Sequence, residues 1–185
     1  MSGLESDKVR VGPYDPAWPF RFAQLGGALR DSLRETALRI DHIGSTSIPG
    51  LAAKPFVDIQ ISVASFEPLD AYRLPLEGLG YVFRPDNPER TKRYFRESPK
   101  ERRTHIHVRR AGSWAEQFSL LFRDYLRTHP EDAGRYAALK HRLAAEYQQD
   151  RHGYTEAKAP RIWEIMVQAD RWSQAVGWEP GPSDA

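Results

Sequence analysis

The stretch "HIGSTSIPGLAAKPFVDIQISV", residues 42–63, decides the fold of this chain. Its second half has a hydrophobic period of two, with apolar residues at the odd positions from Val57 to Val63. The even positions carry polar side chains, notably Asp58 and Gln60. Alternation of this kind predicts a β-strand over residues 55–63 with one apolar and one polar face.

The residues before this strand predict a turn that could bind phosphate. "ALRIDHI", residues 37–43, predicts another strand, which ends at Gly44 and Ser45. A glycine beside a hydroxyl lets backbone N–H groups approach an anion closely. We therefore take Gly44, Ser45 and Thr46 as candidate phosphate contacts, with Lys54 as their countercharge. Gly-Ser pairs are also common in ordinary turns.

A second pair of strands carries two histidines. "RYFRE" at residues 93–97 and "RTHIHVR" at residues 103–109 predict a hairpin, in which His105 and His107 face away from Ile106 and Val108. If this strand neighbours residues 55–63, the histidines and the polar pair Asp58 and Gln60 line one cleft. The alternation equally fits a strand with a solvated face, and two imidazoles alone do not define a zinc site.

The rest of the chain predicts helices around one core. Asp15 and Pro16 begin a helix near the N-terminus, and residues 65–80 hold another, limited by Pro68 and Pro75. Residues 114–130, 131–150 and 155–172 follow as amphipathic helices, the last starting late or bending at Pro160. With 185 residues, we expect one domain over residues 9–176, with disordered segments at 1–8 and 177–185.

Composition excludes several classes of protein. The chain has no Cys, 40% hydrophobic and 28% charged residues, and no apolar run long enough for a membrane span. The first ten residues contain no apolar stretch, so we expect no secretory signal. We expect a cytoplasmic location and no membrane partner. A net charge of +2 is small for a nucleic-acid-binding protein, although the basic stretch over residues 90–103 is a candidate surface for an acidic partner.

The whole pattern resembles the GrpB family, whose members have a nucleotidyltransferase-like fold. The blocks that carry the resemblance are "YDPAWPFRF", "HIGSTSIPGLAAKPFVDI", "THIHV", "FRDYLRTHP" followed by "YAALKHRLA", and "YTEAKAPRIWEIM". The resemblance implies an α/β (α+β) fold with a mixed, mostly antiparallel sheet flanked by helices and a helical C-terminal part. It also implies a Gly-Ser turn that binds a nucleotide, and acidic residues on adjacent strands that bind Mg²⁺ or Mn²⁺.

The implied site is only partly present. Twelve residues separate Ser45 from Asp58, as in the superfamily's pattern, but its second acid is replaced by Gln60 and its later acid by "HIH". The Gln60 amide offers a carbonyl oxygen but no negative charge, whereas Mg²⁺ is normally held by carboxylates. The expected metal ligands are Asp58, Gln60 and His107. The expected catalytic residues are Asp58, His105 and His107, with imidazole as a general base. The expected phosphate contacts are Gly44, Ser45, Thr46, Lys54, Arg123 and Lys158.

Three functions remain open from the sequence. The first is a nucleotidyltransferase-fold protein that binds a nucleotide or a coenzyme A-related molecule with a divalent metal, because GrpB-like domains also occur fused to dephospho-coenzyme A kinase. The second is a non-catalytic ligand- or partner-binding module with a degenerate site. The third is a metal-dependent hydrolase built on Asp58, His105 and His107.

Overall fold

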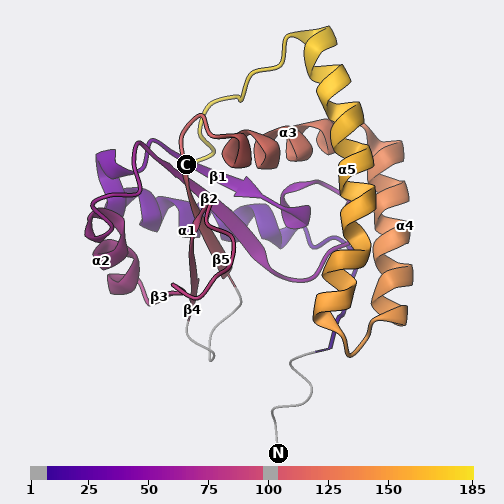
Figure 1. Cartoon of the computed structure of the whole chain (residues 1–185), viewed down its shortest axis with the longest axis horizontal. Helices are drawn as coiled ribbons and strands as arrows, with labels where there is room; N and C mark the ends of the chain where they lie inside the picture. Colours follow the sequence, from indigo (N-terminus) through magenta and orange to yellow (C-terminus); the bar gives the residue numbers. More distant parts are fainter. Residues whose placement is uncertain (1–7, 98–103) are drawn as a thin grey trace, which may run out of the picture.

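One mixed sheet organises the molecule. The computed structural model describes residues 8–97 and 104–185. The strands lie in the order β1-β2-β5-β4-β3, in which the β2–β5 pair is parallel and the other three pairs are antiparallel. The predicted mixed, mostly antiparallel sheet flanked by helices is confirmed (Figure 1). The elements in chain order are α1 (Ala17–Leu33), β1 (Arg39–Ile43), β2 (Val57–Val63), α2 (Asp70–Gly78), β3 (Tyr81–Phe83), β4 (Arg93–Glu97), β5 (Thr104–Arg110), α3 (Trp114–Thr128), α4 (Pro130–Glu146) and α5 (Arg151–Val176).

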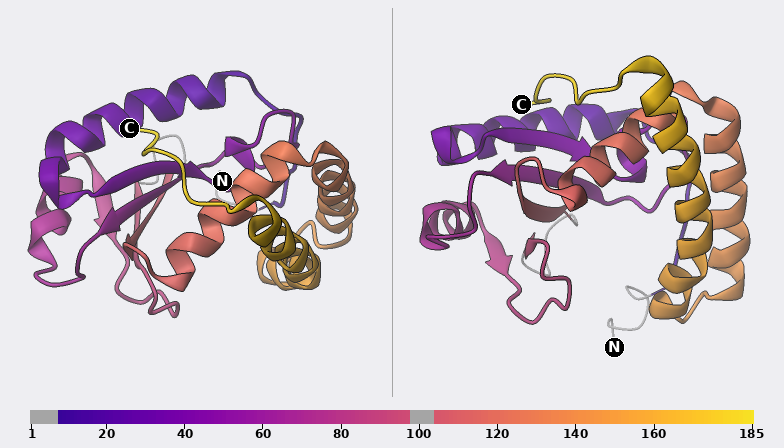
Figure 2. Two further views of the ribbon diagram at one scale, coloured as in Figure 1. Left: turned by 90° about the horizontal axis from the view of Figure 1, so that it is seen from above. Right: turned by 45° about the horizontal axis from the view of Figure 1, so that its top comes forward.

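The two faces of β2 meet different surroundings. Its odd-numbered residues are completely buried or nearly so and pack in a core with side chains of α1 and α2. The opposite face carries the polar residues of β2, and α3 crosses that side of the sheet (Figure 2). The alternation in the sequence therefore separates a hydrophobic core from a polar layer.

The C-terminal helices form a second core beside the sheet. Ser113 caps α3 by accepting a hydrogen bond from the Glu116 N–H, and α4 and α5 run side by side at one end of the sheet (Figure 1). Apolar side chains of α3, α4 and α5 enclose Ile48 and Leu51 from the loop before β2. This packing brings α4 and α5 next to the Gly44-Ser45 turn. No helix of the described segments is long and apolar enough to cross a membrane.

Two prolines lie inside helices instead of limiting them. Pro75 falls within α2, and α5 begins at Arg151, so that Pro160 lies in its interior. The earlier start of α5 follows from Asp150, whose side chain caps the helix by accepting from the Gly153 N–H at 2.8 Å. Pro160 and the residue four positions before it are exposed, so water can satisfy the carbonyl group left without an amide donor.

The C-terminal segment is seated on the sheet, where the sequence predicts a disordered tail. The N–H groups of Asp184 and Ala185 donate to the Ile40 carbonyl, and the Ser183 hydroxyl accepts from the Ile40 N–H. Strand β1 lies at the edge of the sheet, so its outer backbone groups need partners that the tail supplies. Residues 1–7 of the predicted disordered N-terminus lie outside the described residues.

Candidate functional site

Asp58 and two histidines meet on the polar face of the sheet. The parallel register places Asp58 of β2 opposite His105 of β5, with His107 two residues further along. The Asp58 Oδ1 lies 3.0 Å from His105 Nδ1 and 3.4 Å from His107 Nε2. One possible ligand atom from each residue lies within 4.8 Å of the others, and 27% of the Asp58 side chain is exposed. The two strands are neighbours, and their pairing creates an accessible cluster, here called the Asp-His-His cluster.

Burial and hydrogen bonding set the charges in this cluster. Burial acts to raise the pKa of Asp58, but hydrogen bonds with His105 and His107 outweigh it and hold that pKa well below its usual range. Burial lowers the pKa of His107 despite the opposing effect of its Asp58 hydrogen bond. Near neutral pH the cluster therefore presents an ionised carboxylate beside a neutral His107 imidazole.

Gln60 is placed differently from Asp58. Its side chain is fully buried under α3, where its Nε2 donates to the Glu116 carbonyl at 3.3 Å. Its Oε1 is buried and has no hydrogen-bond partner among the described residues. Gln60 thus shares a face with the cluster but lies deeper, beneath the helix.

The Gly44-Ser45 turn touches the cluster directly. Gly44 has a φ of +71°, and a Cβ there would lie 2.7 Å from Asp58 Oδ2. Only glycine allows both this backbone conformation and this close approach. The Thr46 hydroxyl donates to the Phe56 carbonyl at 3.0 Å and also contacts His42, so it fastens the turn to the residues before β2.

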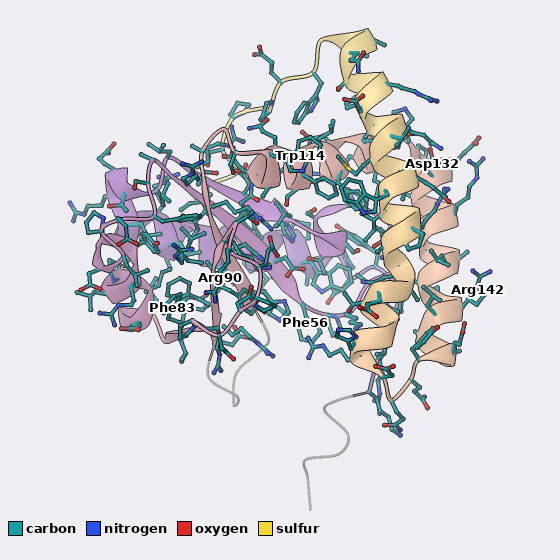
Figure 3. The ribbon with its side chains drawn as sticks, viewed as in Figure 1. Phe56, Phe83, Arg90, Trp114, Asp132 and Arg142 are labelled. Carbon is teal, nitrogen blue, oxygen red and sulfur yellow. The ribbon has the colours of Figure 1, made fainter. Side chains whose placement is uncertain are left out.

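A polar pocket of about 180 Å³ opens between this turn, the start of β2 and the helices α4 and α5. Phe56 lines it on the side of the sheet that faces α5 (Figure 3). Asp58 and His105 form one wall, so the pocket and the Asp-His-His cluster are continuous. Four basic residues of the lining, here called the pocket cations, are Lys54, Lys140, Arg151 and Lys158.

The pocket cations are held by neutral groups. The Lys140 Nζ donates to the Ser45 Oγ at 3.0 Å and to the Ala52 carbonyl. The ammonium groups of Lys54 and Lys158 lie 4.1 and 4.5 Å from the centre of the Tyr154 ring. Among the described residues, no carboxylate forms an ion pair with a pocket cation. The nearby Asp58 carboxylate therefore offsets only part of the positive charge of the pocket.

Burial and mutual repulsion lower the pKa values of the lysines in this pocket. Burial lowers the pKa of Lys54 to about 8, with added repulsion from Lys158 and Arg151. Burial and repulsion from Lys158 lower the pKa of Lys140 to about 7. Burial also lowers the pKa of Lys158, although the Asp58 charge opposes the shift. An anion that enters the pocket would relieve this repulsion.

Lys140 and Arg151 were missed from the sequence. Lys140 lies 95 residues after its partner Ser45, so no local spacing connects them. Its position does carry a signal, because it falls on the buried stripe of α4 with Tyr136 and Leu143, where an apolar residue is expected.

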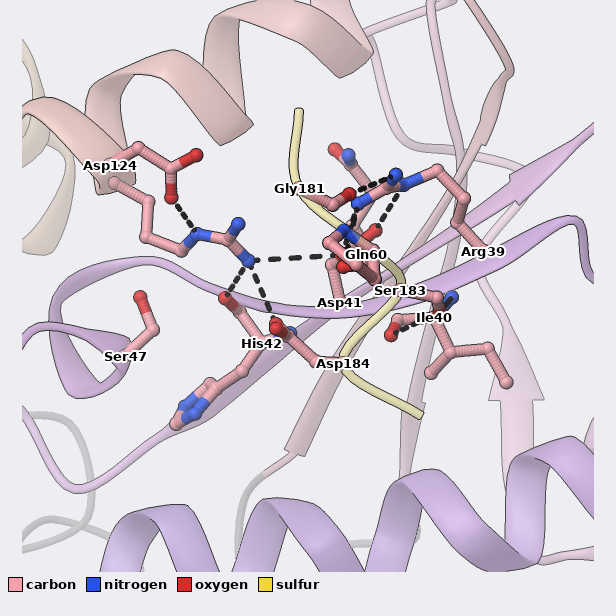
Figure 4. Close-up of polar contacts among 12 residues, drawn as sticks. Arg39, Ile40, Asp41, His42, Ser47, Gln60, Asp124, Gly181, Ser183 and Asp184 are labelled. Carbon is pink, nitrogen blue, oxygen red and sulfur yellow. Dashed lines mark hydrogen bonds and ion pairs between the residues drawn. The ribbon is translucent and has the colours of Figure 1, made fainter. Parts of the chain in front are cut away.

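Arg123, a predicted phosphate contact, lies in another cluster. It is 3% exposed, and its guanidinium group donates to Asp184 Oδ2 at 2.8 Å and to Asp124 Oδ1 at 2.7 Å (Figure 4). Arg39 pairs with Asp41 beside it at 2.8 Å. These five residues, here called the tail cluster, join β1, α3 and the C-terminal segment. Arg123 is thus already paired and does not line the pocket.

Comparison with known proteins identifies relatives across most of the chain. A protein of Pseudomonas aeruginosa named UPF0157 protein PA4798 is 40% identical over 91% of this chain and 70% of its own length. A Mycolicibacterium paratuberculosis protein named dephospho-CoA kinase is 32% identical over 93% of this chain, which spans 48% of that protein. The crystal structure of conserved protein GrpB from Enterococcus faecalis superposes with a TM-score of 0.80 and 34% identity, covering 88% of this chain and 99% of that one.

The family model described as GrpB protein matches residues 8–168, which include the Asp-His-His cluster and all the pocket cations. The chain therefore belongs to the GrpB family.

Proposed function

We propose that the pocket binds the phosphate groups of a nucleotide or a related phosphorylated small molecule, with a divalent metal at Asp58. The observation that carries this proposal is the set of pocket cations, which line the pocket together with Ser45, form no ion pair with a carboxylate among the described residues and adjoin the Asp-His-His cluster. Lys140 is buried and Lys54 and Lys158 are half-buried, and cations withdrawn from water are costly unless they are paired. A phosphorylated ligand supplies the missing negative charge.

The size of the pocket favours the phosphate end of such a ligand. Pockets that enclose a whole drug-sized molecule usually have volumes of roughly 300–1,000 Å³. A volume of about 180 Å³ is smaller than that, and the lining is mainly polar and charged. The phosphates would occupy the pocket while the remainder of the ligand extends outside it.

The names of the relatives suggest which ligands to test. One relative is named dephospho-CoA kinase, although this chain spans less than half of it. Analogy of this kind selects candidates without assigning an activity. Coenzyme A precursors therefore belong in the panel beside ATP and GTP.

Nucleotidyl transfer is the reaction that we propose for this arrangement. A bound divalent ion would supply charge stabilisation for the phosphoryl oxygens, and Asp58 with a neighbouring histidine would hold it. His107 Nε2 lies 3.4 Å from Asp58 Oδ1 and would share in holding that ion. Ser45 and the pocket cations would orient the phosphate chain.

Isothermal titration calorimetry tests the binding step. We expect ATP, GTP or dephospho-coenzyme A to bind in the presence of Mn²⁺, and Lys158→Ala to weaken that binding by about tenfold, as for a charge-assisted hydrogen bond. Arg142→Ala removes the same charge from the exposed outer side of α4 and should leave binding unchanged (Figure 3). Absence of binding by every ligand, or an equal loss in both variants, would overturn the proposal.

A binding module without turnover is the second candidate. It is favoured by Gln60, because the site has one accessible carboxylate where metal-dependent transfer commonly uses several. The two candidates separate in an assay with radiolabelled ATP. Label transferred to an acceptor supports the transferase, whereas tight binding with no transfer across a broad acceptor panel supports the module.

A further inference from the structure

We infer that Asp58, His105 and His107 hold a single divalent ion of the borderline class, such as Zn²⁺ or Co²⁺, in preference to Mg²⁺. This inference deepens the proposed function, on which it rests for the phosphate ligand beside the ion. Its own test uses the ion alone.

The distances from Asp58 Oδ1 to the two histidine nitrogens suit such an ion. For metal–ligand distances of about 2.1 Å, neighbouring ligands lie about 3.4 Å apart in a tetrahedron and about 3.0 Å apart in an octahedron. The Asp58 Oδ1 lies 3.0 Å from His105 Nδ1 and 3.4 Å from His107 Nε2. The three side chains come from two adjacent strands in register, so the sheet fixes their separation.

The chemistry of the donors selects the class of ion. Mg²⁺ prefers oxygen ligands in a nearly regular octahedron, whereas imidazole suits Zn²⁺, Fe²⁺ and Co²⁺. The cluster offers two imidazoles and one carboxylate. Sets of two histidines and one carboxylate leave coordination positions open for water or substrate.

Unpartnered polar atoms give an independent reason to expect a ligand here. Five buried side-chain nitrogen or oxygen atoms have no hydrogen-bond partner within the described part of the chain. Four of the five lie on this face of the sheet: His105 Nε2, His107 Nδ1, Arg109 Nε and Gln60 Oε1. Buried polar atoms are normally partnered, so this concentration indicates that bound water or a polar ligand reaches this face of the sheet, and the two ring nitrogens concerned are the ones turned away from Asp58 Oδ1.

The surrounding charges limit the site to one ion. The other buried carboxylates near the polar face have partners, since Asp41 pairs with Arg39 and Glu116 accepts from the Ser62 hydroxyl and the Gly112 N–H. Two-metal sites use the second ion to neutralise charge on the reacting phosphate. Here the pocket cations lie next to a single ion, and they would supply the positive charge that the second ion provides in a two-metal site.

Titration of tag-free, metal-free protein with Co²⁺ tests this inference. We expect about one equivalent to bind, with visible absorption bands of histidine-ligated Co²⁺, displacement by Zn²⁺ and no displacement by a 100-fold excess of Mg²⁺. Asp58→Asn and His107→Ala should each weaken Co²⁺ binding at least tenfold, with circular dichroism confirming that each variant folds. His152→Ala removes an exposed histidine of α5 and should change nothing.

The outcomes separate the ion from the phosphate ligand. The inference is overturned if Asp58→Asn and His107→Ala bind Co²⁺ as tightly as the wild-type protein does. It is also overturned if equimolar Mg²⁺ displaces the Co²⁺. Lys158→Ala should keep its Co²⁺ affinity while losing ATP affinity. If Co²⁺ binds as expected but no phosphate ligand binds, the ion site is supported and the proposed function is contradicted. If ATP binds but Co²⁺ does not, phosphate binding is supported and the ion site is contradicted.

Discussion

Two groups of basic residues lie near the same sheet, and they differ in their partners. In the tail cluster, Arg39 and Arg123 are paired with Asp41, Asp124 and Asp184. The pocket cations instead contact a hydroxyl, a carbonyl and aromatic rings, and burial lowers the pKa of each buried lysine among them. A buried cation with a carboxylate partner fastens the fold, whereas a buried cation without one is available to an external anion.

Removing a paired cation should have the largest effect on stability. Arg123→Met leaves Asp184 and Asp124 without their shared guanidinium partner, and breaking one side of a buried ion pair typically costs about 3–5 kcal/mol. Urea denaturation should show the free energy of unfolding reduced by this amount. A loss below about 1 kcal/mol would show that the tail cluster does not fasten the fold.

Removing unpaired cations should affect binding instead. The double variant Lys54→Ala/Lys158→Ala should bind ATP roughly 100-fold more weakly, about 3 kcal/mol, because two charge-assisted contacts are lost. Its free energy of unfolding should change little, since neither ammonium group has a carboxylate partner among the described residues. Calorimetry and urea denaturation on the same samples check both statements. If the double variant has a much lower free energy of unfolding but binds ATP as tightly as the wild-type protein, the pocket cations stabilise the fold and do not bind the anion.

The pocket cations should also give stability a distinctive pH dependence. The pKa of Lys140 is lowered in the folded protein to about 7, so the unfolded chain binds more protons between pH 7 and 9. The free energy of unfolding should therefore rise with pH in this window, by about 1 kcal/mol per pH unit. Lys140→Met should flatten the rise. A slope of the opposite sign, or one unchanged in Lys140→Met, contradicts this assignment.

The smallest expected effect is at the rim of the tail cluster. Asp184→Ala removes a carboxylate that accepts from the His42 N–H at 2.9 Å and from Arg123 at 2.8 Å. We expect a loss of about 1–2 kcal/mol, because the Asp184 side chain is partly exposed and water can replace some of its contacts. Asp170→Ala, on the exposed surface of α5, is the control and should leave the unfolding midpoint unchanged.

The sequence predicts the parts of this architecture that follow a local period. The alternation around Asp58 and the "HIH" pattern of β5 correctly place a polar and an apolar face on two strands, and these strands prove to be neighbours. Period and turn chemistry are properties of adjacent residues, so they can be detected without a structure.

Contacts made by helix packing and by the tail could not be predicted in this way. Lys140 reaches Ser45 only because the second core seats α4 beside the turn. Arg123 has the charge expected of a phosphate contact, but it is paired with Asp184, from a segment whose Gly and Pro content predicts disorder. In both cases the deciding partner is distant in sequence, so local spacing does not identify it, although the place of Lys140 on the buried stripe of α4 marks that lysine as unusual.

The central claim is that an anion enters the pocket and meets cations that have no carboxylate partner among the described residues. Calorimetric titration of the metal-free protein with ATP at pH 8, in two buffers of different ionisation enthalpy, measures the protons taken up on binding. Since the pKa values of Lys140 and Lys54 are about 7 and 8, both are partly neutral at this pH, and the bound phosphates should recharge them. The account predicts an uptake of about one proton per ATP, reduced in Lys140→Met. Binding heats that are independent of the buffer, or a release of protons, would contradict it.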